Sequence, residues 1–242
     1  MRALEPIDLT VEPGEFVAVV GTSGCGKSTL LEIIAGLQRP TTGRVVLDGE
    51  PVVATHPRVS VVFQEDSTFP WRTVHDNVAF GLQMRGVPRR QIDERVRAMI
   101  ELVGLGGFDR AYPHQLSGGM RQRVAITRTL VMDPAVMLMD EPFGALDEQT
   151  RFTLGEELLR IWRTTGCTIF FVTHGLHEAE QLADRIVVMT RRPGRIARVF
   201  QNDLPRPRRE TDDPVRYAEL IEGMRETLGL VAAAAPLEST AV

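Results

Sequence analysis

The stretch that decides the fold is Gly21-Thr22-Ser23-Gly24-Cys25-Gly26-Lys27-Ser28. It fits the pattern G-x-x-x-x-G-K-[ST] and stands in the context that this pattern requires. The apolar run Phe16–Val20 before it is typical of a strand buried on both faces. After it, apolar residues recur at helical spacing from Leu30 to Leu37. The sequence therefore predicts a strand, a glycine-rich loop and a helix in succession.

A loop of this kind can hold phosphate groups. Glycines allow backbone N–H groups to curl around phosphate oxygens, and the following helix adds the positive end of its dipole. Lys27 would reach the β- and γ-phosphates of a nucleotide, and the Ser28 hydroxyl would ligate Mg²⁺. The plain alternative is a glycine-rich turn with a chance lysine, which the strand and helix on either side disfavour.

Along the rest of the chain, short apolar runs alternate with helical patterns, which indicates parallel strand connections. Strands are expected at residues 45–47, 59–63, 135–139, 167–172 and 185–189, with a turn at Asp48-Gly49. From about residue 75 to 130 the sequence indicates helices and no buried strand, so we expect a helical lobe inserted in an α/β core. We assign residues 1–204 to this domain. Residues 205–242 form a basic segment, a short helix around Tyr217–Leu228 and a frayed tail from Val231.

The bulk composition limits the classes of protein to which the chain can belong. A chain of 242 residues with 43% apolar and 25% charged residues suits one large globular α/β domain. A net charge of −4 argues against sequence-independent nucleic-acid binding. The two cysteines, Cys25 and Cys167, are too few for a disulfide framework and suggest a reducing compartment. The N-terminus has no signal-peptide core, and no apolar run approaches the ~20 residues that span a bilayer. If the protein acts at a membrane, we therefore expect it to do so from outside the lipid, by docking.

Two carboxylates, Asp140 and Glu141, end the apolar run Met137-Leu138-Met139. At the carboxyl end of a strand, Asp140 could hold the Mg²⁺ shell while Glu141 acts as general base on water. A solvated acidic loop is the common alternative, and the phosphate loop earlier in the chain favours the functional interpretation.

A second glycine motif, Leu116-Ser117-Gly118-Gly119-Met120-Arg121-Gln122, joins a natural N-cap to two glycines that leave a helix start open to phosphate. Taken alone it could be an ordinary capped helix. Together with the phosphate loop and Asp140-Glu141 it resembles the signature of the ABC ATPase family, and the resemblance extends from about residue 4 to 200. It implies that family's fold: a P-loop NTPase core with a mainly parallel sheet, an antiparallel β region and an inserted helical lobe.

The resemblance also implies site residues and the cofactors ATP and Mg²⁺. Gln64 matches the family's Q-loop, Gly144–Asp147 its D-loop, and His174 the switch histidine thought to contact the γ-phosphate. The candidate catalytic residues are Glu141, His174 and Gln64. The candidate Mg²⁺ ligands are Ser28, Gln64 and Asp140. The candidate nucleotide-binding residues are Gly21, Thr22, Ser23, Gly24, Cys25, Gly26, Lys27, Ser28, Thr29, Ser117, Gly118, Gly119 and Asp147.

The partners implied by the family are other chains. Two such domains meet head to tail, as a homodimer in the simplest case, with two ATP molecules between them. Each phosphate loop then faces residues Ser117–Gly119 of the other copy. The closed dimer would act on integral-membrane permease subunits at the cytoplasmic face of the cell membrane, through the Gln64 segment and the helical lobe.

A narrower resemblance concerns the type of transporter. Four segments are similar to the ATP-binding subunits of bacterial nitrate, taurine and aliphatic-sulfonate importers: Phe69–Val74, Leu116–Arg123, Arg192–Ile196 and Leu204–Arg208. This implies uptake of a small anionic solute delivered by a separate periplasmic or extracellular binding protein. For Arg206, Arg208 and Arg209 we consider a solvated basic loop first, with contact to anionic lipid or to the permease as the alternative.

Other interpretations stay open. The chain could serve another importer or an exporter, act on nucleic acid or the ribosome, or be a degenerate cassette that binds nucleotide without turnover. Its single cassette, with no coiled coil between Lys27 and Ser117, and the presence of Glu141 and His174, disfavour the last two. The family's adenine-stacking aromatic would precede Met1, so we expect either an upstream start or binding that depends mainly on the phosphates.

Overall fold

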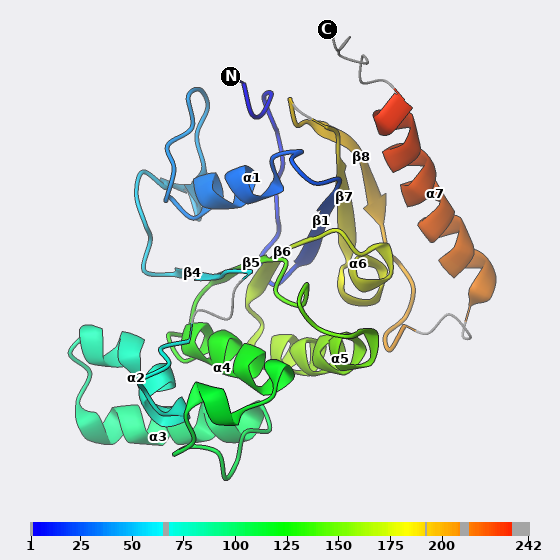
Figure 1. Ribbon diagram of the computed structural model, residues 1–242. Helices are drawn as coiled ribbons and strands as arrows, with labels where there is room; N and C mark the ends of the chain where they lie inside the picture. The colour runs from blue at the N-terminus through cyan, green and yellow to red at the C-terminus, as the bar shows by residue number, and fades with distance from the viewer. Residues whose placement is uncertain (1, 65–67, 192, 209–212, 234–242) are drawn as a thin grey trace, which may run out of the picture. The chain divides into compact units, whose positions relative to one another are not determined.

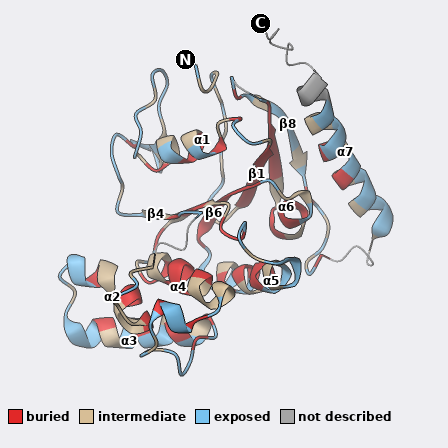
Figure 2. Cartoon of the chain, in the orientation of Figure 1, coloured by how far each residue is buried: buried red, intermediate tan, exposed pale blue. Residues whose placement is uncertain are grey.

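A computed structural model describes residues 2–64, 68–191, 193–208 and 213–233. The chain divides into two compact units. The first comprises Met1–Val11, Phe16–Ala54 and Phe171–Val242, and the second comprises Glu12–Glu15 and Thr55–Phe170. Figure 1 shows the elements of both units, and Figure 2 shows which of their residues are buried.

Strand β1 (Phe16–Gly21) is the centre of the first unit, and all six of its residues are buried. It pairs in parallel with β7 (Arg185–Met189), which pairs antiparallel with β8 (Ile196–Gln201). Because both faces of β1 are covered, its sequence is continuously apolar, as expected for a buried parallel strand. The red colour of β1 in Figure 2 marks this core.

The other elements of this unit follow the candidate phosphate loop or belong to the C-terminal region. Helix α1 (Lys27–Ile34) follows β1, and β2 (Val46–Leu47) and β3 (Glu50–Pro51) form a small antiparallel hairpin. The hairpin turn places Asp48 at φ 50° and Gly49 at φ 85°, the left-handed conformation of a two-residue turn. Helix α6 (Leu176–Leu182) follows strand β6 (Thr168–Thr173), whose residues are divided between the two units.

The C-terminal helix α7 (Pro214–Ala233) lies along β7, β8 and α6 (Figure 1). Its buried residues Ile221 and Met224 face this layer. A Cβ on Gly223 would lie 3.0 Å from the ring of Phe200, so the small residue allows close packing on β8. The helix has 20 residues and is longer than the sequence predicted. The tail from residue 234 onward lies outside the described residues.

The second unit contains the parallel pair β4 (Val59–Val62) and β5 (Val136–Asp140). Among the described residues between these strands, the regular elements are all helical, as the pattern predicted. They are α2 (Val74–Met84), α3 (Arg89–Leu102), the 3-10 turn η1 (Pro113–Gln115) and α4 (Gly118–Leu130). Helix α2 packs against α3 and α4, and α5 (Glu148–Thr165) follows β5.

Two strands were not predicted from the sequence, namely the two-residue β3, which follows the expected turn, and β8. Strand β8 has mostly exposed or half-buried residues, and its sequence lacks the apolar run that marks β1. It pairs with β7 alone, so only one of its sides belongs to the ladder. Because an edge strand buries little, its sequence carries only a weak strand signal.

Candidate nucleotide-binding site

The loop between β1 and α1 has the backbone that its glycines predict. Gly24 has φ 76° and Gly26 has φ 98°, a conformation that residues with a Cβ rarely adopt. A Cβ on Gly21 would lie 2.6 Å from the sulfur of Cys25. Gly26 is the N-cap of α1 and provides no side-chain hydrogen bond to the first helical turn. The loop therefore curls tightly and leads into a helix start without a side-chain cap.

The polar groups of this loop suit an anionic ligand. Lys27 is 6% exposed, and its ammonium donates a hydrogen bond to the carbonyl of Gly21 at 2.9 Å. The hydroxyl of Thr22 is buried and has no hydrogen-bond partner among the described residues. Ser23 and Ser28 are exposed, and Thr29 is half-buried. A buried cation, an uncapped helix start and an unpaired hydroxyl together fit nucleotide phosphates.

A second segment supports the loop. Gly194 accepts a hydrogen bond from the Glu5 N–H and donates to the Ala3 carbonyl, both at 2.9 Å. A Cβ on Gly194 would collide with the carbonyl of Cys25 at 2.0 Å. A Cβ on Gly26 would lie 2.5 Å from the Leu4 side chain. In the sequence, Arg192–Ile196 stood out only because it resembles importer subunits. Its packing against the phosphate loop was not predicted. Arg192 itself lies outside the described residues.

His174 belongs to the same unit as the phosphate loop. It follows β6 directly, and its side chain is exposed. The neighbouring Thr173 hydroxyl donates to the carboxylate of Glu178 and accepts from the Gly175 N–H at 2.9 Å. The backbone on both sides of His174 is therefore held by hydrogen bonds.

Asp140 ends β5 in the second unit and Glu141 follows it, and both are half-buried. Glu141 has φ 43°, which is uncommon for a residue with a Cβ and costs conformational free energy. The Gly144 N–H donates to the Glu141 carbonyl at 3.0 Å, so the chain turns sharply after the strand. Strain of this kind is often found where a side chain must be aimed at a reacting group.

The glycine motif at 116–122 and the loop at 144–147 pack together within the second unit. The Ser117 hydroxyl caps α4 by accepting from the Met120 N–H at 3.3 Å. A Cβ on Gly118 would lie 3.2 Å from the Leu146 side chain, and one on Gly119 would lie 3.0 Å from that of Thr150. A side chain at either position would therefore require a small shift of the neighbouring side chain.

Asp147 caps α5, accepting from the Thr150 N–H at 2.9 Å. This backbone hydrogen bond, followed by the one from the Thr150 hydroxyl, lowers the pKa of the Asp147 carboxyl below its usual 3.8. Asp147 and Ser117 are thus each the N-cap of the helix that follows them, and each accepts a hydrogen bond from its first turn.

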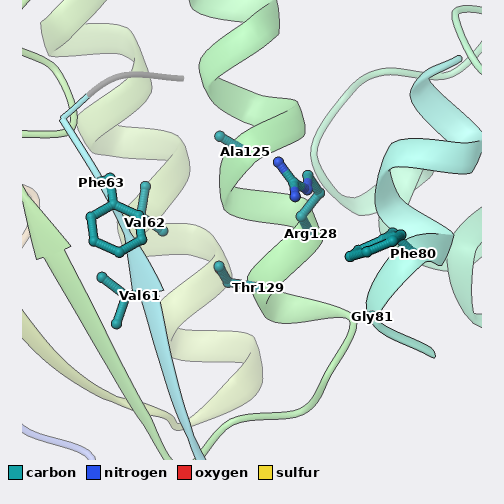
Figure 3. Close-up of a pocket in the computed structure, with 8 residues that line it drawn as sticks. All are labelled: Val61, Val62, Phe63, Phe80, Gly81, Ala125, Arg128 and Thr129. Carbon is teal, nitrogen blue, oxygen red and sulfur yellow. The ribbon is translucent and has the colours of Figure 1, made fainter. Parts of the chain in front are cut away.

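Gln64 is exposed and follows Phe63, which lines a cavity of about 230 Å³. Figure 3 shows the Arg128 side chain in this cavity, with apolar groups from β4 and α2 around it. Burial, followed by the charge of Arg72, lowers the pKa of the Arg128 guanidinium. The lining residues are Val61, Val62, Phe63, Phe80, Gly81, Ala125, Arg128 and Thr129.

The segment Phe69–Thr73 beside this cavity is held by a buried amide. Asn77 accepts from the Phe69 N–H at 2.8 Å, and its NH₂ donates to the carbonyls of Phe69, Arg72 and Thr73. The Arg128 guanidinium lies 4.4 Å from the centre of the Phe69 ring. Trp71 remains 71% exposed on this rigid support. The unit thus presents an exposed aromatic side chain on a hydrogen-bonded segment.

The candidate residues fall into two sets. Residues 21–29 and His174 lie in the first unit, and Gln64, Ser117–Gly119, Asp140, Glu141 and Asp147 lie in the second. Among the described residues, no group of three or more His, Cys, Asp or Glu could hold a metal ion by itself.

The interpretation of the basic segment as a solvated loop is wrong for Arg206 and Arg208. Their side chains are 13% and 2% exposed, and both donate to backbone carbonyls. Arg209 lies outside the described residues. Arginine is common in exposed segments, and only the tertiary structure shows that carbonyl groups of α6 lie within reach of these two.

Comparison with known proteins identifies the family. A family model described as ABC transporter matches residues 4–144. The chain belongs to the ABC transporter family. It is 54% identical over 211 residues to an uncharacterized ABC transporter ATP-binding protein of Methanocaldococcus jannaschii, covering 87% of this chain and 79% of that one.

Two further relatives are named for the solute that they import. An aliphatic sulfonates import ATP-binding protein of Bacillus cereus is 46% identical, covering 88% of this chain and 84% of its own. A nitrate import ATP-binding protein of Synechocystis is 48% identical, covering 84% and 76%. The predicted resemblance to ATP-binding subunits of importers is confirmed.

Solved structures confirm the predicted fold class. The structure of cbiO1 from Clostridium perfringens, part of an ABC transporter complex, has a TM-score of 0.78 at 27% identity and covers 95% of this chain and 92% of its own. A dimeric ATP-binding cassette in a post-hydrolysis state, bound to ADP and Pi, has a TM-score of 0.71 at 31% identity and covers 84% and 92%. No helix in the described ranges is both long and apolar enough to cross a membrane.

Proposed function

We propose that this chain binds and hydrolyses ATP as the motor subunit of an importer for a small anionic solute, such as nitrate, taurine or an alkanesulfonate. The observation that carries the proposal is the phosphate loop. Left-handed Gly24 and Gly26 curl the backbone, α1 starts without a side-chain cap, and buried Lys27 supplies the cation. The import proteins among the relatives support the solute class.

Each candidate residue would have its own role in nucleotide binding or hydrolysis. The N–H groups of residues 22–28 and Lys27 would bind the phosphates, and Ser28, Asp140 and Gln64 would hold Mg²⁺ directly or through water. When bound, Mg²⁺ neutralises phosphate charge and orients the γ-phosphate for attack. Glu141 would orient and deprotonate the attacking water, and His174 would donate a hydrogen bond to the γ-phosphate.

A second copy of the chain would complete each site. In the dimer that we propose, Ser117, Gly118 and Gly119 of one copy face the phosphate loop of the other, and Asp147 lies at the same interface. The N-terminus of α4 would then add its dipole to the γ-phosphate. A dimeric relative bound to ADP and Pi supports this arrangement. Hydrolysis would remove the phosphate that holds the copies together.

The permease would dock on the second unit, at the cytoplasmic face of the membrane. The Phe69–Thr73 segment, held by Asn77, provides an aromatic surface with exposed Trp71 for this contact. Movement of a docked partner would reach the nucleotide through the Gln64 segment and the helical lobe. A solute-binding protein outside the membrane would act on this chain only through the permease.

The proposal is tested by Glu141→Gln. Gln retains the shape of Glu but cannot accept a proton from water at neutral pH, so turnover should fall by ~10²–10⁴-fold. ATP binding should survive, and the variant should accumulate as an ATP-bound dimer. Size-exclusion chromatography with MgATP and with MgADP measures the dimer, and release of phosphate measures turnover.

The matched control is Glu148→Gln, an exposed carboxylate in the first turn of α5. It removes the same charge close by and should leave turnover within about two-fold, as surface substitutions usually do. Near-normal turnover by Glu141→Gln would mean that the general base lies elsewhere, and the assignment of Asp140-Glu141 would be withdrawn.

A further inference from the structure

The short helix α6 is connected at its start to His174. It has seven residues, Leu176–Leu182, and its N-cap is Gly175. The Glu178 side chain is 9% exposed and accepts a hydrogen bond from the Thr173 hydroxyl, which in turn accepts from the Gly175 N–H. The two residues that flank His174 are therefore bonded to each other and to the first turns of α6. Any displacement of α6 would move this loop.

The other end of α6 is held by a buried arginine. The Arg208 guanidinium donates to the carbonyls of Glu180 at 3.1 Å and Ala183 at 2.6 Å. It also donates to the carbonyls of Asn202 at 2.9 Å and Leu204 at 3.0 Å. The last carbonyls of a helix lack intrahelical partners and form the negative end of its dipole. A buried guanidinium with these four acceptors suits that position.

Two more contacts join α6 to its surroundings. Arg206 donates to the Leu182 carbonyl at 2.6 Å and to the Asp184 carboxylate, which accepts from the Phe16 N–H at the start of β1. On the side of the helix, the rings of His177 and Tyr217 stack with centroids 5.9 Å apart, and the Tyr217 hydroxyl is within hydrogen-bonding distance of the His177 Nδ1. The C-terminal segment thus contacts α6 at its end and on its side.

Arg208 is the central contact at the end of α6 because it is a cation beside a buried carboxyl. Glu180 is 2% exposed, and its Oε1 has no hydrogen-bond partner in the described part of the chain. Burial raises the pKa of the Glu180 carboxyl to about 7, against the lowering effect of Arg208. Removing the guanidinium would take a hydrogen-bond donor from four carbonyls, of which that of Glu180 keeps the Asn202 amide at 2.7 Å, and would deprive a buried carboxyl of its neighbouring cation. Unpaired buried groups of this kind are costly, so the end of α6 should loosen.

We propose that Arg208 is a positioning residue for His174, acting through α6 with help from Arg206 and Tyr217. The inference rests on the proposed function, in which His174 contacts the γ-phosphate during hydrolysis. A catalytic group displaced by about 1 Å can lose on the order of 10²-fold in rate. The C-terminal segment would therefore contribute to turnover although it does not touch the nucleotide.

The test combines two substitutions in the full chain. Arg208→Met removes the charge and the hydrogen bonds but keeps the length of the side chain. We expect kcat for ATP to fall by about 10- to 100-fold, with KM within about two-fold, because positioning affects the hydrolytic step. In a His174→Ala background, Arg208→Met should change kcat by less than about two-fold, since residues that act as one unit are not additive.

Matched variants separate positioning from general loss of stability. Arg225→Met removes an exposed arginine of α7 and should leave kcat unchanged. Tyr217→Phe removes one hydroxyl and keeps the ring. It should lower kcat by a few-fold, and it remains informative if Arg208→Met fails to fold. Hydrogen exchange at Gly175–Leu182, measured for all variants, should be faster in Arg208→Met and Tyr217→Phe than in Arg225→Met.

The outcomes distinguish this inference from the proposed function. Normal turnover by His174→Ala would remove the role of His174 and contradict the proposed mechanism. If His174→Ala is slow and the two test variants turn over normally, the proposed function stands and the inference is wrong. The inference is also overturned if Arg208→Met lowers kcat by the same factor with and without His174, or if only KM changes.

Discussion

The starts of helices α1 and α4 carry the two glycine motifs of the chain, and they are built differently. Helix α1 has left-handed Gly26 as N-cap, with no side-chain hydrogen bond to its first turn. Helix α4 has Ser117 as N-cap, and the serine accepts from the Met120 N–H. One helix leaves its first N–H groups to a ligand, whereas the other satisfies one of them with its own side chain.

This difference corresponds to two proposed modes of phosphate binding. The first helix has a buried lysine in its first turn and would bind phosphate within a single chain. The second has no buried cation in its first turn, and its glycines pack on Leu146 and Thr150. It would meet a phosphate only when a second copy supplies the nucleotide. The comparison predicts that damage to α1 abolishes binding, whereas damage to α4 impairs dimer-dependent hydrolysis.

The largest effect should come from Lys27→Ala. Loss of a buried cation that faces phosphate should weaken ATP binding by about 2–5 kcal/mol, which is roughly 30-fold or more. Calorimetric titration of the free chain with MgATP measures this affinity. Wild-type affinity in the variant would refute the assignment of the phosphate loop and remove the distinction between the two helix starts.

The next largest effects are expected from two glycine substitutions. Gly26→Ala places a Cβ at φ 98° and against Leu4, so it should lower the free energy of unfolding by about 1–3 kcal/mol and also reduce ATP binding. Gly118→Ala needs only a small shift of Leu146, so the free energy of unfolding should change by less than about 1 kcal/mol.

Gly118→Ala should nevertheless reduce turnover and the ATP-dependent dimer while the monomer still binds ATP. Denaturant unfolding, ATP titration and size-exclusion chromatography measure the three properties. Equal loss of ATP affinity in both variants would contradict the comparison, because α4 would then contribute within a single chain.

Ser117→Ala should change stability less than Gly26→Ala does. Removal of an N-cap hydroxyl typically costs ~1 kcal/mol of stability. Turnover should fall further at low protein concentration than at high concentration, because the loss affects the closed dimer. Phosphate release measured over a range of protein concentrations checks this, and a concentration-independent defect would argue against a shared site.

The smallest effect should come from Asp147→Asn, which keeps an N-cap but removes its charge. The pKa of Asp147 is lowered in the folded chain, so its ionised form stabilises the fold above the unfolded pKa. This contribution is lost as the pH falls through the folded pKa, which lies below 3.8. The midpoint of thermal unfolding of the variant should therefore be slightly lower at pH 7 and should equal that of wild type in strong acid. If the unfolding midpoints still differ in strong acid, the shape of the side chain at position 147, and not its charge, causes the change in stability.

Much of the architecture could be predicted from local patterns. The buried run Phe16–Val20, the glycine spacing from Gly21 to Gly26 and the two carboxylates after Met139 each lie in one continuous segment. Such signals predict a strand, a loop and a strand end because period and turn chemistry are local properties. Strand β8 was missed because its exposed face lacks an apolar pattern, and its pairing with β7 depends on residues distant in sequence.

The sequence by itself determined the family, the phosphate loop and the identity of the candidate catalytic groups, because these depend on residue types at short, fixed spacings. Only the tertiary structure decided that Arg206 and Arg208 are buried against the end of α6, and that Gly194 packs on the Cys25 carbonyl. These contacts join segments far apart in the chain. A guanidinium or a glycine has the same local signature whether it is solvated or packed, so its role is set by the acceptors and atoms that folding brings within reach.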